Sequence, residues 1–461
     1  MTFREFSATI FTSTPAAERF HDFELSILRV NPMANASPSR RTFLQSSAAA
    51  AAAGTVLLNS IPAVHAAEAS DKTLKFGLVG CGGRGGGAVV DALTADKNIK
   101  LVAMCDLFGD RLAAKLGELQ ADYKDRIDVP EERRFTGFDG YKQLIDTDVD
   151  VVLLCSTPGF RPQHLAYAVE KGKHVFMEKP HATDATGLRS VLESVKKAKE
   201  KKLCLVSGFT YRYDEFKRET MKRIHGGAIG DVQTIHTTYL TGDLWYRGHE
   251  DRTAMEYQCR NWYYYTWLSG DFNVEQHIHS IDKAAWVMDG KLPIAATGMG
   301  GRQTRTDKKY GNIFDHFTVV YEYENGAKVF SQCRQAAGCH GETRDYIAGT
   351  KGTAELMEHI VAPTGGERWK MKGRHDLGKA YVQEHIELFG AIREGKVIND
   401  GEVSAYSTLM GIMGREAAYS GQRITWKQML DSKQNLMPAK LALDAEPPKV
   451  EIAVPGKYKF V

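Results

Sequence analysis

A glycine-rich segment between an apolar strand and a helix constrains this sequence more than any other feature. The apolar run TLKFGLVG at residues 73–80 leads into a G-x-G-x-x-G pattern at Gly80, Gly82 and Gly85, and the helical spacing AVVDAL follows. In such a turn the first glycine permits a sharp bend, the second lets a pyrophosphate approach the backbone, and the third lets the helix pack against the strand. The N-terminus of the helix then faces the negative charge. The segment therefore predicts a dinucleotide-binding turn, and a flexible glycine loop is the alternative.

Two further apolar segments extend this unit into a β-α-β-α-β half. The predicted strand IKLVAMCD ends at Asp106, about 20 residues after the glycine pattern, where an acid accepts the ribose 2′-hydroxyl of a dinucleotide. Such a carboxylate repels a 2′-phosphate, so Asp106 predicts NAD rather than NADP, and Arg111 nearby leaves NADP as the alternative. The run DVDVVLLCSTP at residues 148–158 is apolar on both faces, which is typical of a central parallel strand.

The segments that follow make a family resemblance specific. GKHVFMEKP at residues 172–180 closes another predicted strand, and LCLVSGFTYRY at residues 203–213 follows a charged helix. With the glycine turn, the acid and the STP turn, these segments occur in the order seen in the glucose–fructose oxidoreductase and inositol dehydrogenase (Gfo/Idh/MocA) family, which the chain resembles. The resemblance implies an α/β fold class: an N-terminal Rossmann dinucleotide-binding domain and a C-terminal α+β domain with a large, mainly antiparallel open sheet.

The same resemblance implies which residues bind the cofactor. They belong to the glycine turn, the acid, the STP turn, the following helix and the E-K-P motif: Gly80, Gly82, Gly83, Arg84, Gly85, Asp106, Ser156, Thr157, Pro158, His164 and Glu178. In the family the lysine of the E-K-P motif hydrogen-bonds the reacting hydroxyl, and this catalytic role is assigned to Lys179. A solvated loop lysine is the alternative interpretation.

The second half of the sequence changes to antiparallel character. Residues 314–335 read as two period-two runs joined by Asn325-Gly326, which is a strong hairpin signal. The segment RDYIAGTKGTAEL at residues 344–356 resembles a strand–turn–strand of the family. Because the open face of this sheet commonly forms an oligomer interface in the family, the resemblance implies a homo-oligomer.

The segment GDFNVEQHIHSIDKAAW at residues 270–286 carries the candidate catalytic residues. On a helix, Glu275, His279 and Asp282 lie on one face, because their spacing is i, i+4 and i+7. The family has an Asp four residues before a His and a second Asp three residues after it. The resemblance therefore implies that His279 transfers the proton, that Glu275 orients it or binds substrate, and that Asp282 supports the helix face. This chain has Glu275 where the family usually has Asp, which puts its substrate choice in question.

A metal site is the alternative interpretation of this segment, because Glu, His and Asp side chains are all metal ligands. On a helix, His277 and His279 diverge by about 200 degrees, so both cannot bind one ion. The sequence therefore predicts no metal.

An aromatic cluster directly precedes this segment. Residues 260–267 read RNWYYYTW, for which ordinary core packing is one interpretation. The other is a sugar site, in which aromatic walls and a few polar groups form the pocket. The predicted substrate-binding residues are Tyr211, Arg212, Arg260, Trp262 and Asp282.

Charge and cysteine content exclude two classes of protein. The formal net charge is only +3, without the basic surface of a nucleic-acid binder, so no nucleic-acid partner is expected. The seven cysteines are sparse, odd in number and without a C-x-x-C pair, which excludes a disulfide scaffold and weakens a zinc site.

The N-terminal region predicts export. Ser39-Arg40-Arg41-Thr42 precedes an Ala-rich apolar stretch at residues 43–67, which resembles a twin-arginine signal with cleavage after Ala66 or Ala67. We expect a periplasmic protein without stable membrane insertion after signal removal. A membrane anchor is the alternative, although Ala and Ser make the stretch weakly hydrophobic. Met33 is the expected start, because it leaves a short basic lead.

These features predict four parts: an N-terminal extension with the signal peptide at residues 1–67, a Rossmann NAD-binding domain at 72–208, a substrate-binding α+β domain at 209–440, and a C-terminal tail at 441–461.

The resemblance implies an NAD(P)-dependent oxidoreductase that transfers a hydride from a sugar, polyol or sugar derivative, a small carbohydrate-type substrate. Free nicotinamide cofactor is scarce outside the cytoplasm, so a redox-neutral, NAD-retaining glycosidase or epimerase is one alternative. A non-catalytic NAD-binding protein is the other.

Overall fold

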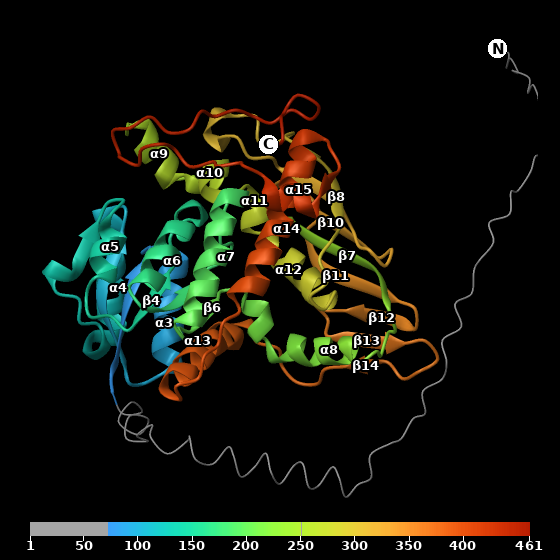
Figure 1. Cartoon of the computed structure of the whole chain (residues 1–461), viewed down its shortest axis with the longest axis horizontal. Helices are drawn as coiled ribbons and strands as arrows, with labels where there is room; N and C mark the ends of the chain where they lie inside the picture. Colours follow the sequence, from blue (N-terminus) through green and yellow to red (C-terminus); the bar gives the residue numbers. More distant parts are fainter. Residues whose placement is uncertain (1–71, 250) are drawn as a thin grey trace, which may run out of the picture. The chain divides into compact units, whose positions relative to one another are not determined.

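A six-stranded parallel sheet forms the first layer of the chain (Figure 1). The computed structural model describes residues 72–249 and 251–461. The strands run in the order β3-β2-β1-β4-β5-β6, and all adjacent pairs are parallel. Their bounds are β1 Leu74–Val79, β2 Ile99–Asp106, β3 Arg134–Thr136, β4 Val151–Leu154, β5 His174–Met177 and β6 Leu205–Ser207. This order reverses between β1 and β4, as in the dinucleotide-binding α/β fold, and confirms the predicted Rossmann domain.

Helices cover both faces of this sheet. One face packs against α5 (Gly140–Ile145), α6 (Arg161–Glu170) and α7 (Ala185–Glu200). The other face packs against α3 (Gly83–Ala95), α4 (Gly109–Tyr123) and α13 (Leu377–Arg393). Helix α13 comes from the far end of the chain, and its Phe389 ring packs edge-on against Phe76 of β1 at a centroid distance of 6.4 Å. The C-terminal half therefore completes the core of the first sheet.

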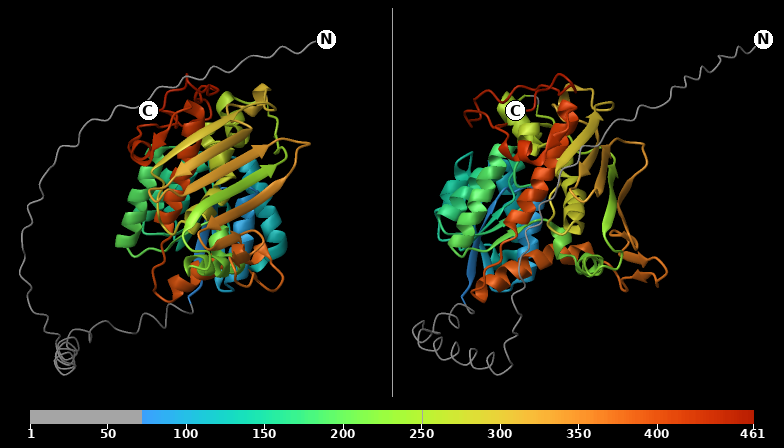
Figure 2. Two further views of the ribbon diagram at one scale, coloured as in Figure 1. Left: turned by 90° about the vertical axis from the view of Figure 1, so that its right-hand side faces the viewer. Right: turned by 45° about the vertical axis from the view of Figure 1, so that its right-hand side comes forward.

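A nine-stranded sheet forms the second layer, and the left view of Figure 2 looks onto its strands. The strand order is β14-β13-β12-β11-β7-β10-β9-β8-β15, with all pairs antiparallel except β7 with β10. The bounds are β7 Val232–Thr241, β8 Ala295–Gly301, β9 His316–Glu322, β10 Lys328–Gln335, β11 Glu342–Gly349, β12 Gly352–Glu355, β13 Ile360–Pro363, β14 Trp369–Lys370 and β15 Ile424–Thr425. The predicted mainly antiparallel sheet is confirmed, including the hairpin of β9 and β10 at Asn325-Gly326.

Helix α14 (Gly401–Ser420) lies between the two layers, with nearly every residue from Ser404 to Ser420 buried. It packs against α7 on one side and against β8, β9, α11 (Phe272–Glu275) and α12 (Ile278–Val287) on the other (Figures 1 and 2). At Gly411, a Cβ atom would lie 2.8 Å from the Ile278 side chain, so glycine permits this close approach.

Short elements complete the described part of the chain. The remaining helices are α8 Glu215–His225, α9 Ala254–Arg260, α10 Thr266–Ser269 and α15 Trp426–Asp431. Short 3-10 turns are η1 Lys124–Arg126, η2 Glu131–Arg133, η3 Pro158–Phe160, η4 Thr210–Tyr213, η5 Trp262–Tyr264 and η6 Lys308–Tyr310. No helix within residues 72–249 and 251–461 is both long and apolar enough to cross a bilayer.

Two segments differ from their predicted secondary structure. The strand predicted across residues 203–213 ends at Ser207, because the chain turns at Gly208 and continues as the turn η4. A Cβ atom at Gly208 would lie 2.8 Å from Glu178, so this turn packs tightly on the E-K-P motif. The helix predicted across residues 270–286 is split into α11 and α12, with the break at Gln276 and His277.

Candidate active site

The glycine turn connects β1 to α3 with the geometry that the sequence predicts. Gly80 has a φ of +100°, a conformation that favours glycine, and a Cβ atom there would lie 2.6 Å from the backbone of Cys155. A Cβ atom at Gly85 would lie 1.9 Å from the carbonyl oxygen of Gly80, so the first turn of α3 packs directly on the loop. Cβ atoms at Gly82 and Gly83 would meet nothing within 4 Å. The turn therefore leaves open space at the N-terminus of α3.

The carboxylate of Asp106 lies at the end of β2, beside this turn. Its two oxygens accept hydrogen bonds from the backbone N–H groups of Cys81, at 2.7 Å, and Phe108, at 2.9 Å. Burial raises the pKa of Asp106, while these two hydrogen bonds and Arg111 oppose the rise.

A pocket of about 460 Å³ opens where β1, β2, β4 and β5 end. In open α/β sheets, ligands bind at this edge, where the strand order reverses. All predicted cofactor-binding residues line it except Pro158, which is buried at the start of η3. The three predicted catalytic residues, Lys179, Glu275 and His279, line the same pocket. The structure thus brings the two predicted sets together from both halves of the chain.

Lys179 and Glu275 form the central contact between the two halves. The ammonium group of Lys179 donates hydrogen bonds to the backbone oxygen of Glu275, at 2.6 Å, and to its carboxylate, at 3.1 Å. Both side chains are largely buried, with 13% and 15% exposure. Glu275 therefore binds Lys179. No hydrogen bond joins Glu275 to the imidazole of His279, which Glu275 was predicted to orient.

His279 lies in the first turn of α12 and faces the same pocket. Its ring packs edge-on against Tyr211 at a centroid distance of 5.5 Å, and its Nδ1 atom has no hydrogen-bond partner among the described residues. Burial lowers the pKa of His279 well below 6.5, and the positive charges of Lys179 and Lys283 lower it further. The imidazole is therefore neutral near neutral pH and able to accept a proton.

A second neutral histidine lines the same pocket. Nδ1 of His164 lies 3.0 Å from the hydroxyl of Ser156, and its ring packs on Tyr141 at 4.0 Å. Burial, with a contribution from Arg161, lowers the pKa of His164 to about 3.

Four of the five predicted substrate-binding residues do not line the pocket; Trp262 does. Arg212 binds the carboxylate of Asp282 through two nitrogens, at 2.7–3.0 Å. The two side chains therefore bind each other and connect η4 to α12. Arg260 binds Asp110 at 3.0 and 3.1 Å and joins α9 to the first turn of α4. Tyr211 packs behind His279 instead of reaching the pocket wall.

His277 faces away from His279. Its Nε2 atom lies 2.7 Å from the hydroxyl of Ser331 in β10, inside the second layer. Within residues 72–249 and 251–461, no three His, Cys, Asp or Glu side chains lie close enough together to hold a metal ion.

Several lining residues were not predicted from the sequence. Trp245 and Arg247 come from the loop after β7, and Tyr381 comes from α13. Arg161 is buried in α6, where it donates a hydrogen bond to the backbone oxygen of Pro180 at 2.5 Å. Its position three residues before His164 is a local signal that could have identified it. The other three have no such signal, because distant elements bring them to the pocket.

Comparison with known proteins gives family matches along most of the described chain. The model described as "Oxidoreductase family, NAD-binding Rossmann fold" matches residues 74–208, and the "GFO/IDH/MocA C-terminal domain" matches residues 218–355. A twin-arginine translocation signal matches residues 37–56, which indicates export by that route; these residues lie outside the described part.

The individual relatives include inositol dehydrogenases and a glycosyl hydrolase family 109 protein. Inositol 2-dehydrogenase 3 of Saccharopolyspora erythraea is 27% identical over 290 residues, which are 62% of this chain and 74% of the relative. Glycosyl hydrolase family 109 protein 1 of Bacteroides fragilis is 28% identical over 346 residues, 73% of this chain and 67% of the relative. A levoglucosan dehydrogenase, solved with NADH and levoglucosan, shares the fold at a TM-score of 0.60 and 18% identity, covering 76% of this chain and 99% of that chain.

Proposed function

Because this chain belongs to the Gfo/Idh/MocA family of NAD-binding oxidoreductases, we propose that it oxidises a hydroxyl group of a sugar, polyol or sugar derivative. The observation that carries this proposal is the convergence of Lys179, Glu275 and His279 on the pocket that also contains the glycine turn. A dehydrogenase needs a proton acceptor and a positive charge at the reacting hydroxyl, beside a cofactor site.

The residues of the pocket fit a nicotinamide dinucleotide. Gly82 and Gly83 leave open space in front of the α3 N-terminus, where backbone N–H groups would hold the pyrophosphate. Asp106 would accept the ribose hydroxyls, and the Ser156–His164 pair would lie toward the nicotinamide. The bound dinucleotide would supply the hydride acceptor.

Three residues of the chain would accept the hydroxyl proton and stabilise the negative charge on the substrate oxygen. Neutral His279 takes the proton of the substrate hydroxyl as its general base. The ammonium of Lys179 stabilises the negative charge that develops on the oxygen. Glu275 keeps Lys179 aimed at the pocket through two hydrogen bonds, which limits the reorganisation needed during reaction.

We propose NAD as the preferred cofactor, because the carboxylate of Asp106 lies where a 2′-phosphate would be repelled. NADP is the alternative. Arg111 and Arg247 line the same pocket, and neither guanidinium pairs with an acid among the described residues, so both could bind a phosphate.

A redox-neutral reaction is the second candidate function. The twin-arginine signal would carry the protein to a compartment poor in free dinucleotide, and one relative is named a glycosyl hydrolase. An enzyme that retained its dinucleotide and restored it in each turnover would fit both observations.

Turnover assays separate these functions. We expect purified protein with a set of inositols, aldoses and anhydrosugars to form reduced dinucleotide in proportion to product, faster with NAD than with NADP. Absorbance of the reduced nicotinamide measures this directly. Release of the aglycone from glycosides without added dinucleotide, and without net reduction, would instead establish the redox-neutral reaction. Faster turnover with NADP would assign Arg111 and Arg247 to the 2′-phosphate.

We further propose that the open face of the second sheet forms a homo-oligomer. Phe330 of β10 and Tyr346 of β11 flank His236 of β7 in one cross-strand row, and Met299 of β8 is 72% exposed. Exposed apolar side chains in adjacent strands are typical of an interface. Analytical ultracentrifugation is expected to detect a dimer or larger species, and a monomer at all concentrations would contradict this.

A further inference from the structure

Helix α14 contacts both segments that carry the candidate catalytic residues. One segment follows Lys179 in the first layer, and the other contains Glu275 and His279 in the second. Apart from Ser407, the residues that make these contacts, together with Arg415, recur every three or four positions on one face of the helix. The contacts are Ser407 with Asp282 at 2.7 Å, Thr408 with the backbone of His181 at 3.3 Å, Gly411 with Asn273 at 2.8 Å, and Tyr419 with Asp271 at 2.6 Å.

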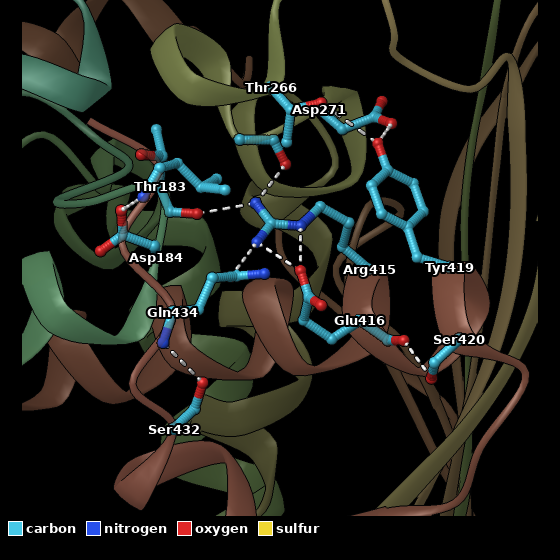
Figure 3. Close-up of polar contacts among 12 residues, drawn as sticks. Thr183, Asp184, Thr266, Asp271, Arg415, Glu416, Tyr419, Ser420, Ser432 and Gln434 are labelled. Atoms are coloured by element: carbon cyan, nitrogen blue, oxygen red, sulfur yellow. Dashed lines mark hydrogen bonds and ion pairs between the residues drawn. The ribbon is translucent and has the colours of Figure 1, made fainter. Parts of the chain in front are cut away.

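Arg415 stands in the middle of this face and joins the two segments through their backbone (Figure 3). Its Nη1 atom donates hydrogen bonds to the carbonyl oxygens of Thr183, at 2.7 Å, and Gly270, at 3.1 Å. Thr183 follows Lys179 by four residues, and Gly270 precedes Glu275 by five. One guanidinium therefore holds the main chain on both sides of the catalytic contact.

The charge of this buried guanidinium is fully paired. Arg415 and Glu416 are both 0% exposed, and one carboxylate oxygen of Glu416 accepts from Nε at 3.0 Å and from Nη2 at 2.7 Å. The C-terminal segment, residues 432–461, closes the network. Gln434 accepts from Nη2 at 3.0 Å, and the Tyr458 hydroxyl donates to the other oxygen of Glu416 at 2.9 Å. A fully satisfied buried network of this kind is rigid.

The main chain near the site is fixed from the same helix at a second point. Asp271 begins α11 with a φ of +68°, and its carboxylate accepts hydrogen bonds from the N–H groups of Phe272, at 2.6 Å, and Phe314, at 2.8 Å. Tyr419 donates to the same carboxylate. The turn of chain that leads into Glu275 is thus held at Gly270 by Arg415 and at Asp271 by Tyr419.

We infer that Arg415 is a positioning residue, which sets the spacing between Lys179 and the Glu275–His279 pair across the two layers. The inference rests on the proposed function for its consequence in catalysis. The geometry needs the fixed fork of a guanidinium, since the ammonium of a lysine at this position cannot reach both carbonyl groups and Glu416 together. Small displacements of catalytic groups reduce rates strongly, even when binding is unchanged.

Two variants test this inference. Arg415→Lys keeps the charge but loses the fork, and the double variant Arg415→Met/Glu416→Gln removes both buried charges together, so that neither is left unpaired. We expect kcat to fall about 10- to 100-fold in each, with little change in the dinucleotide Kd. We also expect faster hydrogen–deuterium exchange in residues 179–186 and 268–282.

Arg126→Lys is the matched control. Arg126 also binds two carbonyl oxygens, those of Leu93 and, at 2.9 Å, Asp96, but both lie at the C-terminal end of α3, outside the two catalytic segments. Its variant should keep wild-type kcat and wild-type exchange in both segments.

The exchange measurement does not depend on turnover, so it separates this inference from the proposed function. Faster exchange of both segments in the Arg415 variants supports the positioning role, whether or not the wild-type protein oxidises a sugar or polyol. If the wild-type protein oxidises neither, only the proposed function is contradicted. Wild-type kcat together with wild-type exchange in folded Arg415→Lys would overturn the inference. If the double variant does not fold, Arg415→Lys decides the matter.

Discussion

Replacing His279 with alanine is expected to lower kcat/KM for hydroxyl oxidation by about 10²- to 10⁴-fold, the usual contribution of a general base. The side chain lines the pocket together with Lys179, and the other histidine that lines this pocket, His164, lies beside the hydroxyl of Ser156. The dinucleotide Kd should stay near its wild-type value, because the proposal assigns the dinucleotide to the glycine turn and Asp106, and His279 to the substrate hydroxyl. Steady-state kinetics and a fluorescence titration of the dinucleotide measure the two effects separately.

The pH dependence of kcat/KM gives a second test of His279 as the base. The neutral imidazole is the active form, and the pKa of His279 lies well below 6.5, so wild-type kcat/KM should hold steady as pH falls from about 8 to about 6.5 and drop only below that. His277→Gln is the control, since His277 bonds to Ser331 and does not face the pocket. If His279→Ala retained wild-type kcat/KM, or if the acid limb had its midpoint above 6.5, His279 would not be the base.

Replacing Gly85 with alanine is expected to weaken dinucleotide binding by about 100-fold or more. The new Cβ atom would lie 1.9 Å from the carbonyl oxygen of Gly80, so the turn must shift away from α3. The pyrophosphate would then lose several charge-assisted hydrogen bonds from backbone N–H groups, each contributing about 1.5–3 kcal/mol. The crowding should also lower the free energy of unfolding by about 1–3 kcal/mol. Dinucleotide titration and urea unfolding measure both losses.

Gly117→Ala is the control for replacing a helical glycine with alanine. Gly117 lies in the middle of α4, where a Cβ atom would meet nothing within 4 Å. This variant should raise the free energy of unfolding by about 0.5–1 kcal/mol and leave dinucleotide affinity unchanged. Wild-type dinucleotide affinity in Gly85→Ala would show that the pyrophosphate does not lie on this turn.

Features that depend on neighbours in the sequence were predicted well. The glycine turn and the E-K-P motif each follow a strand directly, and Asp106 is the last residue of β2, so their place at the sheet edge follows from local pattern alone. The break between α11 and α12 was not predicted. His277 turns into the second layer to meet Ser331, and this distant contact overrides the helical spacing.

Features that depend on distant contacts could not be predicted. The role of Glu275 differs from expectation because its partner, Lys179, lies 96 residues away and approaches from the other layer. The sequence predicts that Arg212 and Asp282 bind substrate, but they bind each other across 70 residues. Arg247 and Tyr381 reach the pocket from elements whose placement only the assembled layers determine.

The packing of α13 on β1 has a consequence for the order of biosynthesis. Phe76 emerges from the ribosome 313 residues before its partner Phe389. The nucleotide half therefore remains incomplete while the nascent chain grows, and it closes only after residues 377–393 have been made. Because the twin-arginine route carries folded proteins, a chain truncated before residue 377 should remain inside the cell.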